Sequence, residues 1–594
     1  MPPMLAYRFL RKISDWTLEG FYSDVHVSGR EHVPEEGPLI IAATHHNEII
    51  DIAALSATIP HRRQVRFWAK STMFKNIFAR ELLTSAGSIP VQRNPDSAST
   101  GPGSNGHGPG GGGKAGMSQA ALFRDTSAAL AAGSVVGVFP EGTSYSEPRI
   151  VQVKDGAAWA AVEYAKAVRR GEVREGRELV VVPAAVVYTD KSQYQSRVCV
   201  RYGEPIPISR YVEGLKEEDE EATRAVVKGV SAEIERRLRA LTINAEDWDT
   251  LSAAAAAREL FFPKPLSLGL DNYVDVSQSL VDTLTDSTAT SEAGQTAKGS
   301  LVRYLALQRY TGISSTTLES LFPSPLSVAM GSSSSSKPPG VTEALRTFFY
   351  QLVATLLHPR ALLFFPMFAV HAPGYLTGWI ASYFLSPRTE EESKTQFKAI
   401  FGGLGLAASY SAVTRLAWKF VNQPFAYLDR LVRRDALPNS LIEFLQHLAA
   451  YLHSSDDWII KLLKRSVAFV LLGCGTTRLL WSWHNLFVML GVTSPTRTDA
   501  TQEELKRYSR PKPPLANPFI KSHSPVSRRL AAGGAEIDAK SIPTSIPSTS
   551  KFIRPLFAAR EEAQTSLRRY ITELSASEAG HEVIAKLRSG GGNL

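Results

Sequence analysis

Two histidines and an aspartate follow an apolar run in "THHNEIID", residues 44–51. His46 precedes Asp51 by five residues. A carboxylate that accepts a hydrogen bond from one imidazole nitrogen fixes the tautomer and leaves the other nitrogen basic, which makes a general base for a hydroxyl group. The alternative interpretation is that both side chains are polar residues of a loop.

The spacing restricts how His46 and Asp51 could meet. Five residues along a regular helix turn through about 500°, which leaves the two side chains about 140° apart. They can pair only if His46 lies in a turn after a strand and Asp51 lies in the first turn of the next helix. The apolar residues before His46 and the helix-like "IIDIAAL" after it fit this arrangement.

A second stretch, "AGSIPVQR" at 86–93, combines a glycine with an arginine. Gly87 would allow close approach of the backbone, and Arg93 offers the planar set of donors that suits a phosphate. The alternative is a turn followed by a surface arginine.

A third stretch, "VFPEGTSYS" at 138–146, follows an apolar run directly. A Pro-Glu-Gly turn exposes backbone N–H groups, and the hydroxyl groups of Thr143 and Ser144 stand beside it, so this place suits an anionic group. Downstream, "PAAVVY" at 183–188 reads as a strand that begins with Pro183.

Strand-like and helix-like segments alternate around these stretches. We predict buried strands at 38–44, 134–139 and 179–188, and helices at 118–132, 155–169 and 216–241. Such alternation predicts an α/β domain with a central, mostly parallel sheet flanked by helices.

The order of these motifs resembles that of the PlsC-type glycerolipid acyltransferase family. The resemblance covers roughly residues 20–245, and with the apolar segments downstream the chain looks most like fungal glycerol-3-phosphate or dihydroxyacetone-phosphate acyltransferases. It implies an enzyme that uses acyl-CoA as co-substrate, without a cofactor or metal, to acylate glycerol-3-phosphate, dihydroxyacetone phosphate or both, the former giving lysophosphatidate.

The resemblance also implies the roles of individual residues. His46, held by Asp51, would remove the proton from the acceptor hydroxyl group. The acceptor phosphate would contact Arg93, Gly87, Glu141, Gly142, Thr143, Ser144 and Lys154, while Pro183 would shape the acyl-chain side of the site.

Two departures from the family pattern stand out. His45 occupies the position before the histidine where the family usually has asparagine, and we expect no role for it. The third motif ends Gly-Thr-Ser, whereas lysophosphatidate acyltransferases commonly have Gly-Thr-Arg, which favours glycerol-3-phosphate. A lysophosphatidate or other lysophospholipid acyltransferase and an inactive lipid-binding membrane scaffold remain alternatives. A serine hydrolase is excluded because no G-x-S-x-G elbow occurs near a strand end.

Outside the predicted α/β domain, we expect amphipathic helices, disordered segments and a membrane-embedded region. We predict an N-terminal amphipathic helix (1–19), packed on the domain or lying in a membrane interface, a flexible Gly-rich insert (94–116), a partly disordered linker (246–340), a helical membrane-embedded region (341–495), and a disordered tail with a terminal amphipathic helix (496–594). Within the fourth region, 361–385 has no Asp, Glu, Lys or Arg, so a kinked span and a re-entrant hairpin are both open.

The composition agrees with a membrane-bound enzyme. The net charge of +9 suits a membrane surface or anionic substrates, and no nucleic-acid partner is indicated. The two cysteines, Cys199 and Cys474, are far apart in sequence, which fits a reducing compartment. We therefore expect an endoplasmic reticulum membrane protein whose active site faces the cytosol.

Overall fold

The computed structural model describes residues 4–91, 114–173, 176–215, 219–263, 267–285, 290–311, 313–321, 359–386, 392–422, 439–454, 458, 460–465, 467 and 553–592. The chain divides into two units. The first comprises Met1–Ser333, Pro387–Thr395 and Thr493–Leu594, and the second comprises Ser334–Ser386 and Gln396–Val492.

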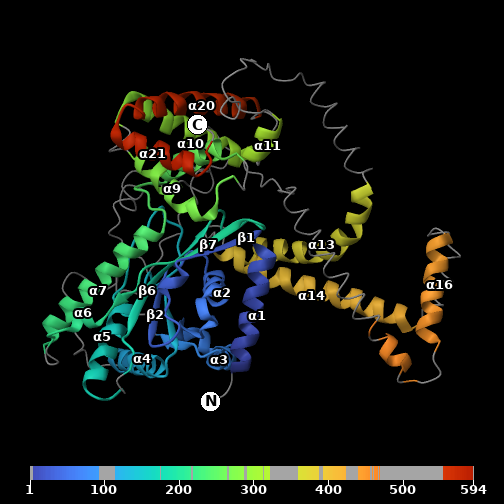
Figure 1. Ribbon diagram of the computed structural model, residues 1–594, viewed down its shortest axis with the longest axis horizontal. Helices are drawn as coiled ribbons and strands as arrows, with labels where there is room; N and C mark the ends of the chain where they lie inside the picture. Colours follow the sequence, from blue (N-terminus) through green and yellow to red (C-terminus); the bar gives the residue numbers. More distant parts are fainter. Residues whose placement is uncertain are drawn as a thin grey trace, which may run out of the picture. The chain divides into compact units, whose positions relative to one another are not determined.

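An eight-stranded sheet forms the centre of the α/β domain in the first unit (Figure 1). Its strands are β1 (Asp24–Ser28), β2 (Leu39–Ala43), β3 (Val65–Lys70), β4 (Ile89–Val91), β5 (Val135–Val138), β6 (Val180–Tyr188), β7 (Arg197–Tyr202) and β8 (Ile206–Pro207). Strands β6-β2-β5-β3-β4 are parallel neighbours, β7 and β8 pair antiparallel with β6, and β1 runs parallel to β7. The predicted mostly parallel sheet is confirmed.

Helices cover both faces of this sheet because its central strands are apolar on both sides. All five residues of β2 are at most 1% exposed. Ile40 and Ala42 of β2 share one core with Val136 of β5 and with residues of α4 (Lys114–Ala131), α5 (Gly156–Arg169) and α7 (Glu220–Leu241). Helix α2 (Ile49–Thr58) packs against β6 and β7, and α1 (Met4–Phe21) packs against α2. The three predicted strands and three predicted helices are thus present as β2, β5, β6, α4, α5 and α7.

Short elements connect these layers. They are η1 (Arg30–His32), η2 (Pro60–Arg62), η3 (Ser71–Lys75), α3 (Ile77–Ser85) and α6 (Ser209–Val212). The predicted N-terminal amphipathic helix is confirmed as α1, which buries Tyr7 and Leu18 and leaves Phe9 and Trp16 exposed. The Gly-rich insert lies outside the described residues, except for its last residues, which begin α4.

The predicted linker at 246–340 is wrong over most of its described length. It contains α8 (Trp248–Phe261), α9 (Leu270–Leu284), α10 (Glu292–Thr311) and α11 (Ser315–Leu321), which share a hydrophobic core. Four alanines of α8, among them Ala253 and Ala257, are at most 2% exposed. Alanine side chains give little hydropathy signal, yet they allow neighbouring helices to approach closely, so this bundle is hard to see in the sequence.

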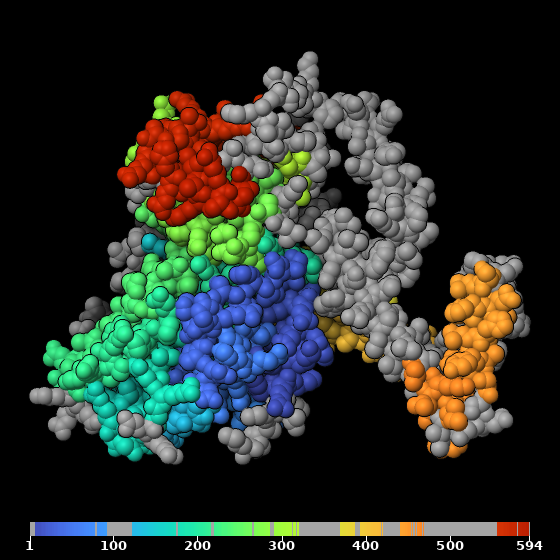
Figure 2. Space-filling view, in the orientation of Figure 1, coloured from blue at the N-terminus to red at the C-terminus, as the bar shows by residue number. Residues whose placement is uncertain are grey.

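The C-terminal helices complete that bundle. Helices α20 (Ile553–Leu574) and α21 (Glu578–Ser589) pack against α10 and α9, so segments far apart in sequence lie side by side (Figures 1 and 2). Leu556, Ala563 and Leu567 of α20 are at most 1% exposed and belong to the bundle core. The buried Arg560 of α20 is paired with Glu319 of α11. The predicted terminal amphipathic helix is therefore present as part of a folded domain, while most of the tail before it lies outside the described residues.

The second unit contains α13 (Pro359–Leu385), most of α14 (Glu392–Asn422) and α16 (Asn439–His453). Helices α13 and α14 approach closely where Thr377 donates a hydrogen bond to the Phe401 carbonyl oxygen, at 2.9 Å. A Cβ added at Gly405 would lie 2.8 Å from the Pro373 oxygen, so only glycine fits that contact. Among the described residues, no helix combines the length and apolar character needed to cross a membrane. The segment 466–495 lies almost wholly outside the described residues.

Candidate active site

The carboxyl ends of β2 and β5 bring the first and third sequence motifs together. The two strands are parallel, with Ala42 opposite Val138, so the residues that follow them leave the sheet at the same edge. Thr44 is fixed there because its N–H donates to the Ala184 carbonyl oxygen and its hydroxyl oxygen accepts from the Val186 N–H. The histidine pair therefore follows a residue that is held in place by β6.

His45 pairs with Asp51. The Nδ1 atom of His45 lies 3.1 Å from Oδ2 of Asp51, which also accepts a hydrogen bond from the Asn47 N–H at 2.7 Å. Asp51 is the third residue of α2 and is fully buried, while the His45 side chain is 12% exposed. The predicted position of Asp51 in the first helical turn is confirmed.

The predicted pairing of His46 with Asp51 is wrong. His46 Nε2 instead lies 3.5 Å from Oε1 of Glu141. The two adjacent histidines follow β2 and face different carboxylates, His45 that of Asp51 in α2 and His46 that of Glu141 in the turn after β5. The five-residue spacing between His46 and Asp51 does not determine the direction in which each side chain leaves the backbone.

Glu141 joins the two histidines. Its Oε1 accepts a hydrogen bond from the His45 backbone N–H at 2.7 Å, and the same atom faces His46. Burial opposes ionisation of Glu141, but the charge of His46 and hydrogen bonds from His46, Tyr145 and the His45 backbone outweigh it and lower the pKa of the carboxyl group. Glu141 is therefore a buried anion at neutral pH.

Stacked aromatic rings hold the His45 imidazole from the side of β5. The Phe139 ring lies 4.1 Å from the His45 ring at 17°, and it stacks in turn on Phe67 of β3 at 5.8 Å. Gly137 of β5 makes room for this stack, since a Cβ there would lie 2.6 Å from Phe67 Cδ1. Phe139 belongs to the third motif and Gly137 precedes it, but neither residue was assigned a role from the motif.

Lys154 lies over the Pro-Glu-Gly turn. Its N–H donates to the Pro140 carbonyl oxygen at 2.7 Å, and a Cβ added at Gly142 would lie 3.1 Å from its Nζ. Gly142 has φ of 80°, the left-handed region that favours glycine. Thr143 and Ser144 follow the turn directly and are partly exposed. The structure therefore brings Lys154, Glu141, Gly142, Thr143 and Ser144 to one place, as predicted, and their contacts with a substrate stay a prediction.

Of the other predicted residues, Gly87 stands apart from this cluster. Gly87 precedes β4 and lies beside Arg66, the second residue of β3, whereas the histidines follow the carboxyl end of β2. Arg93 lies outside the described residues. Pro183 is buried in β6 opposite Ala42, so its suggested role at an acyl chain stays a prediction.

Tyr188 is a member of the site that the motifs did not indicate. It ends β6, and its hydroxyl group donates a hydrogen bond of 2.5 Å to Oδ1 of Asp51. Its only sequence signal is its place as the last residue of the apolar strand "PAAVVY", at the same sheet edge as the histidines.

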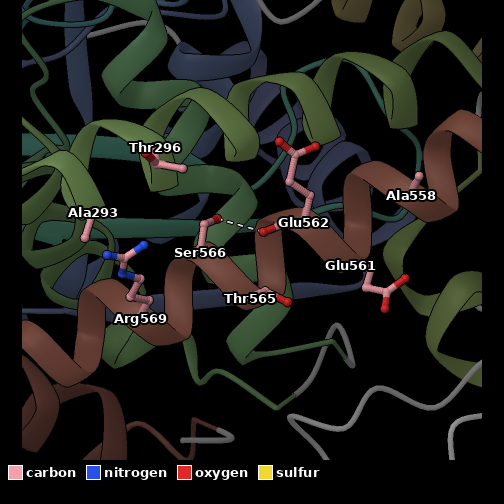
Figure 3. A pocket seen from close by; sticks show the side chains of 8 residues that line it. All are labelled: Ala293, Thr296, Ala558, Glu561, Glu562, Thr565, Ser566 and Arg569. Carbon is pink, nitrogen blue, oxygen red and sulfur yellow. Dashed lines mark hydrogen bonds between the residues drawn. The ribbon is translucent and has the colours of Figure 1, made fainter.

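A pocket of about 480 Å³ lies elsewhere, between α10 and α20 (Figure 3). Ser566 and Arg569 line it, and the Ser566 hydroxyl group donates to the Glu562 carbonyl oxygen at 2.8 Å. All the residues that line it belong to the helical bundle, so this pocket is separate from the histidine cluster.

Comparisons with known proteins find acyltransferases. The Acyltransferase family matches residues 24–187. Glycerol-3-phosphate O-acyltransferase 2 of Saccharomyces cerevisiae is 33% identical over 147 residues, and glycerol-3-phosphate O-acyltransferase 1 of the same yeast is 25% identical over 166 residues. An uncharacterized acyltransferase of Schizosaccharomyces pombe is 23% identical over 334 residues.

These alignments are partial. They cover 25%, 28% and 44% of this chain, and 18%, 21% and 48% of the three relatives in the same order. The solved structure of a 1-acyl-sn-glycerophosphate (LPA) acyltransferase, PlsC, from Thermotoga maritima covers 39% of this chain and 78% of its own, with 18% identity. Its TM-score of 0.26 supports no inference about this chain.

The family predicted from the motifs is confirmed. The chain contains a domain of the Acyltransferase family at residues 24–187, and part of the chain is similar to the yeast glycerol-3-phosphate O-acyltransferases.

Proposed function

We propose that this chain transfers an acyl group from acyl-CoA to a hydroxyl group of glycerol-3-phosphate, dihydroxyacetone phosphate or both; with glycerol-3-phosphate the product is lysophosphatidate. The observation that carries the proposal is the contact of His45 with the buried Asp51, next to a second buried carboxylate, Glu141. The yeast relatives named for glycerol-3-phosphate acylation support the choice of acceptor.

His45 takes the role of general base in this mechanism. With Nδ1–H donating to Asp51, Nε2 keeps its lone pair and removes the proton of the acceptor hydroxyl group. The acceptor oxygen forms a bond with the thioester carbonyl carbon, the carbon–sulfur bond breaks, and the leaving thiolate takes the proton back from the imidazolium. A positioned base of this kind contributes about 10²–10⁴-fold to the rate.

The acceptor phosphate is expected beside the Pro-Glu-Gly turn. Lys154 supplies a cation over Gly142, and Thr143 and Ser144 supply hydroxyl groups next to it. Arg93 remains a proposed contact to the same phosphate. Glu141 would not bind the anion itself, but would hold the His45 backbone and the His46 ring.

Paired substitutions of the two histidines test this mechanism. In a thiol-release assay with palmitoyl-CoA and glycerol-3-phosphate, His45→Asn is expected to lower kcat by about 10²–10⁴-fold. His46→Asn is expected to keep kcat within about tenfold, since its ring faces Glu141 and not Asp51. Full activity of folded His45→Asn would overturn the mechanism, and loss of activity only in His46→Asn would reinstate the alternative base.

The acceptor is tested by comparing three compounds with the same purified chain. We expect higher kcat/KM with glycerol-3-phosphate or dihydroxyacetone phosphate than with lysophosphatidate. The reverse order would make the chain a lysophospholipid acyltransferase. No turnover with any acceptor, at any acyl-CoA chain length, would favour the inactive scaffold.

The proposed setting of the enzyme is the endoplasmic reticulum membrane, with the active site on the cytosolic side, where acyl-CoA is available. Large apolar side chains of the second unit support membrane contact, among them Trp379 and Phe384 of α13 and Phe444 of α16, which are 54%, 74% and 62% exposed. Flotation with phosphatidylcholine–phosphatidylserine vesicles should fail after Trp379→Ser combined with Phe384→Ser. Wild-type chain that stays unbound, or protease protection of residues 30–245 inside sealed microsomes, would contradict this setting.

A further inference from the structure

The two carboxylate oxygens of Asp51 have different partners. Oδ2 faces His45 Nδ1 at 3.1 Å and accepts from the Asn47 N–H at 2.7 Å. Oδ1 accepts from the Tyr188 hydroxyl group at 2.5 Å. The carboxylate is thus oriented by contacts on both sides, and a rotation toward either side would break those on the other.

Tyr188 is itself held in place by its surroundings. It ends β6 and pairs with Val198 of β7, and its ring lies 5.7 Å from that of Tyr22, which follows α1. The Tyr22 ring is only 2% exposed and contacts Phe21 at 5.0 Å. The hydroxyl group therefore reaches Asp51 from a rigid strand and a packed aromatic cluster.

The hydroxyl group stays protonated over the range in which a histidine titrates. Burial raises the pKa of Tyr188 well above its ordinary value, and the charge of Asp51 raises it further. Tyr188 is consequently a permanent donor to the carboxylate and does not act as a base.

We propose that Tyr188 is a positioning residue. Its hydroxyl group holds the Asp51 carboxylate toward His45 and withdraws part of the negative charge of that carboxylate, and Tyr188 thereby sets the base strength of His45. The inference rests on the proposed function, because it assigns His45 as the base. It goes beyond that function because it assigns the base strength of His45 to Tyr188 of β6, which acts on His45 through Asp51.

The sign of the effect follows from the charges around Asp51. The titratable groups that face this cluster are His45 after β2, Tyr188 from β6, Tyr22 after α1, Asp190 after β6, and Glu141 with His46 beside the turn after β5. A donor to Asp51 weakens its attraction for the His45 imidazolium. Removing that donor should strengthen this attraction, and strengthening the donor should weaken it further.

The test is the pH profile of Tyr188→Phe in the purified chain. We expect kcat to fall about tenfold with KM values unchanged within about twofold, because a hydrogen bond to a charged group is lost. The acid limb of the pH profile of kcat/KM, where activity rises with pH, should move to higher pH. Incorporation of 3-fluorotyrosine at position 188, which keeps the ring and strengthens the donor, should move the same limb to lower pH.

Tyr202→Phe is the matched control. Tyr202 lies in the neighbouring strand β7, is 2% exposed, and its hydroxyl group contacts Thr58 at 3.1 Å instead of a site residue. This control should leave the acid limb in place. An acid limb that does not move in either Tyr188 variant would overturn the inference, even if kcat fell, because a purely structural role predicts that result.

His45→Asn in the same series separates the two proposals. If His45→Asn is inactive and the Tyr188 variants keep the wild-type profile, only the role of Tyr188 fails. If folded His45→Asn retains full activity, the proposed function of His45 fails and the inference fails with it. Since 3-fluorotyrosine preserves the shape of the side chain, the test holds even if Tyr188→Phe does not fold.

Discussion

Asp51 contacts His45, six residues before it, and not His46, five residues before it. The contact joins the segment after a strand to the first turn of the next helix. The Asp51 oxygen that faces the His45 ring also accepts a hydrogen bond from the Asn47 N–H. This arrangement leaves His46 for the second carboxylate, Glu141. Two adjacent residues of the same type therefore lie in different electrostatic surroundings.

Replacing Asp51 with asparagine should reduce activity without unfolding the domain. The amide can donate to Nδ1 of His45, which favours the tautomer that carries its proton on Nε2 and so removes the base. We expect kcat with glycerol-3-phosphate to fall by about 10²–10⁴-fold. The control is Asp125→Asn, whose side chain is 52% exposed in α4. Equal activity in the two variants would show that Asp51 does not hold the base.

Glu141 should make part of the free energy of unfolding depend on pH in the acidic range. Its folded pKa is lowered from 4.5, so its stabilising contribution is fully present above about pH 4.5 and is lost as pH falls through the lowered value. Urea unfolding at several pH values should show a shallower loss of stability below pH 4.5 for Glu141→Gln than for the wild type. The exposed Glu246→Gln should follow the wild-type curve, and parallel curves for all three would contradict the prediction.

Gly137→Ala should disturb the site through the aromatic stack. The added Cβ would lie 2.6 Å from Phe67 Cδ1 and 2.9 Å from Val65 Cγ1, so Phe67 must move against Phe139 and thus against His45. We expect a loss of about 1–3 kcal/mol in the free energy of unfolding, together with lower kcat. Gly229→Ala, at an exposed position inside α7 with open space around it, should instead stabilise by about 0.5–1 kcal/mol. Similar effects of the two alanines would argue against the stack.

Leu567→Ala should loosen the helical bundle. Leu567 of α20 is 1% exposed in the core shared with α8, α9 and α10, and such truncations cost about 2–5 kcal/mol. Hydrogen–deuterium exchange should become faster in peptides from α10 as well as from α20. Arg568→Ala, on the exposed face of the same helix, should change exchange very little. Unchanged exchange in α10 after Leu567→Ala would show that the two helices do not stabilise each other.

Strong local patterns made much of the α/β domain predictable. Strands β2, β5 and β6 are apolar runs because they are covered on both faces, and the motifs follow their carboxyl ends. The choice between His45 and His46 was not predictable from spacing, since it depends on the direction in which each side chain leaves the strand. Tyr188 could be found only from the sheet order, which places the end of β6 beside that of β2.

The helical bundle was missed for a different reason. Its alanine-rich helix α8 carries little hydropathy signal, and helix α20, which completes its core, comes much later in the sequence. Arg560 donates to the Leu318 carbonyl oxygen across 242 residues of chain. Pairing over such a distance leaves no trace in a local pattern.

This long-range packing has a consequence for biosynthesis. Ribosomes add about 5–20 residues per second, so α8 to α11 emerge roughly 10–50 seconds before α20 can cover them. During that interval the apolar faces of α10 are open to the surroundings, whereas the sheet of the α/β domain already has every strand it needs. The nascent bundle is therefore the segment on which chaperones should act, and nonsense mutations before α20 should lead to degradation even though they spare every residue of the proposed catalytic site.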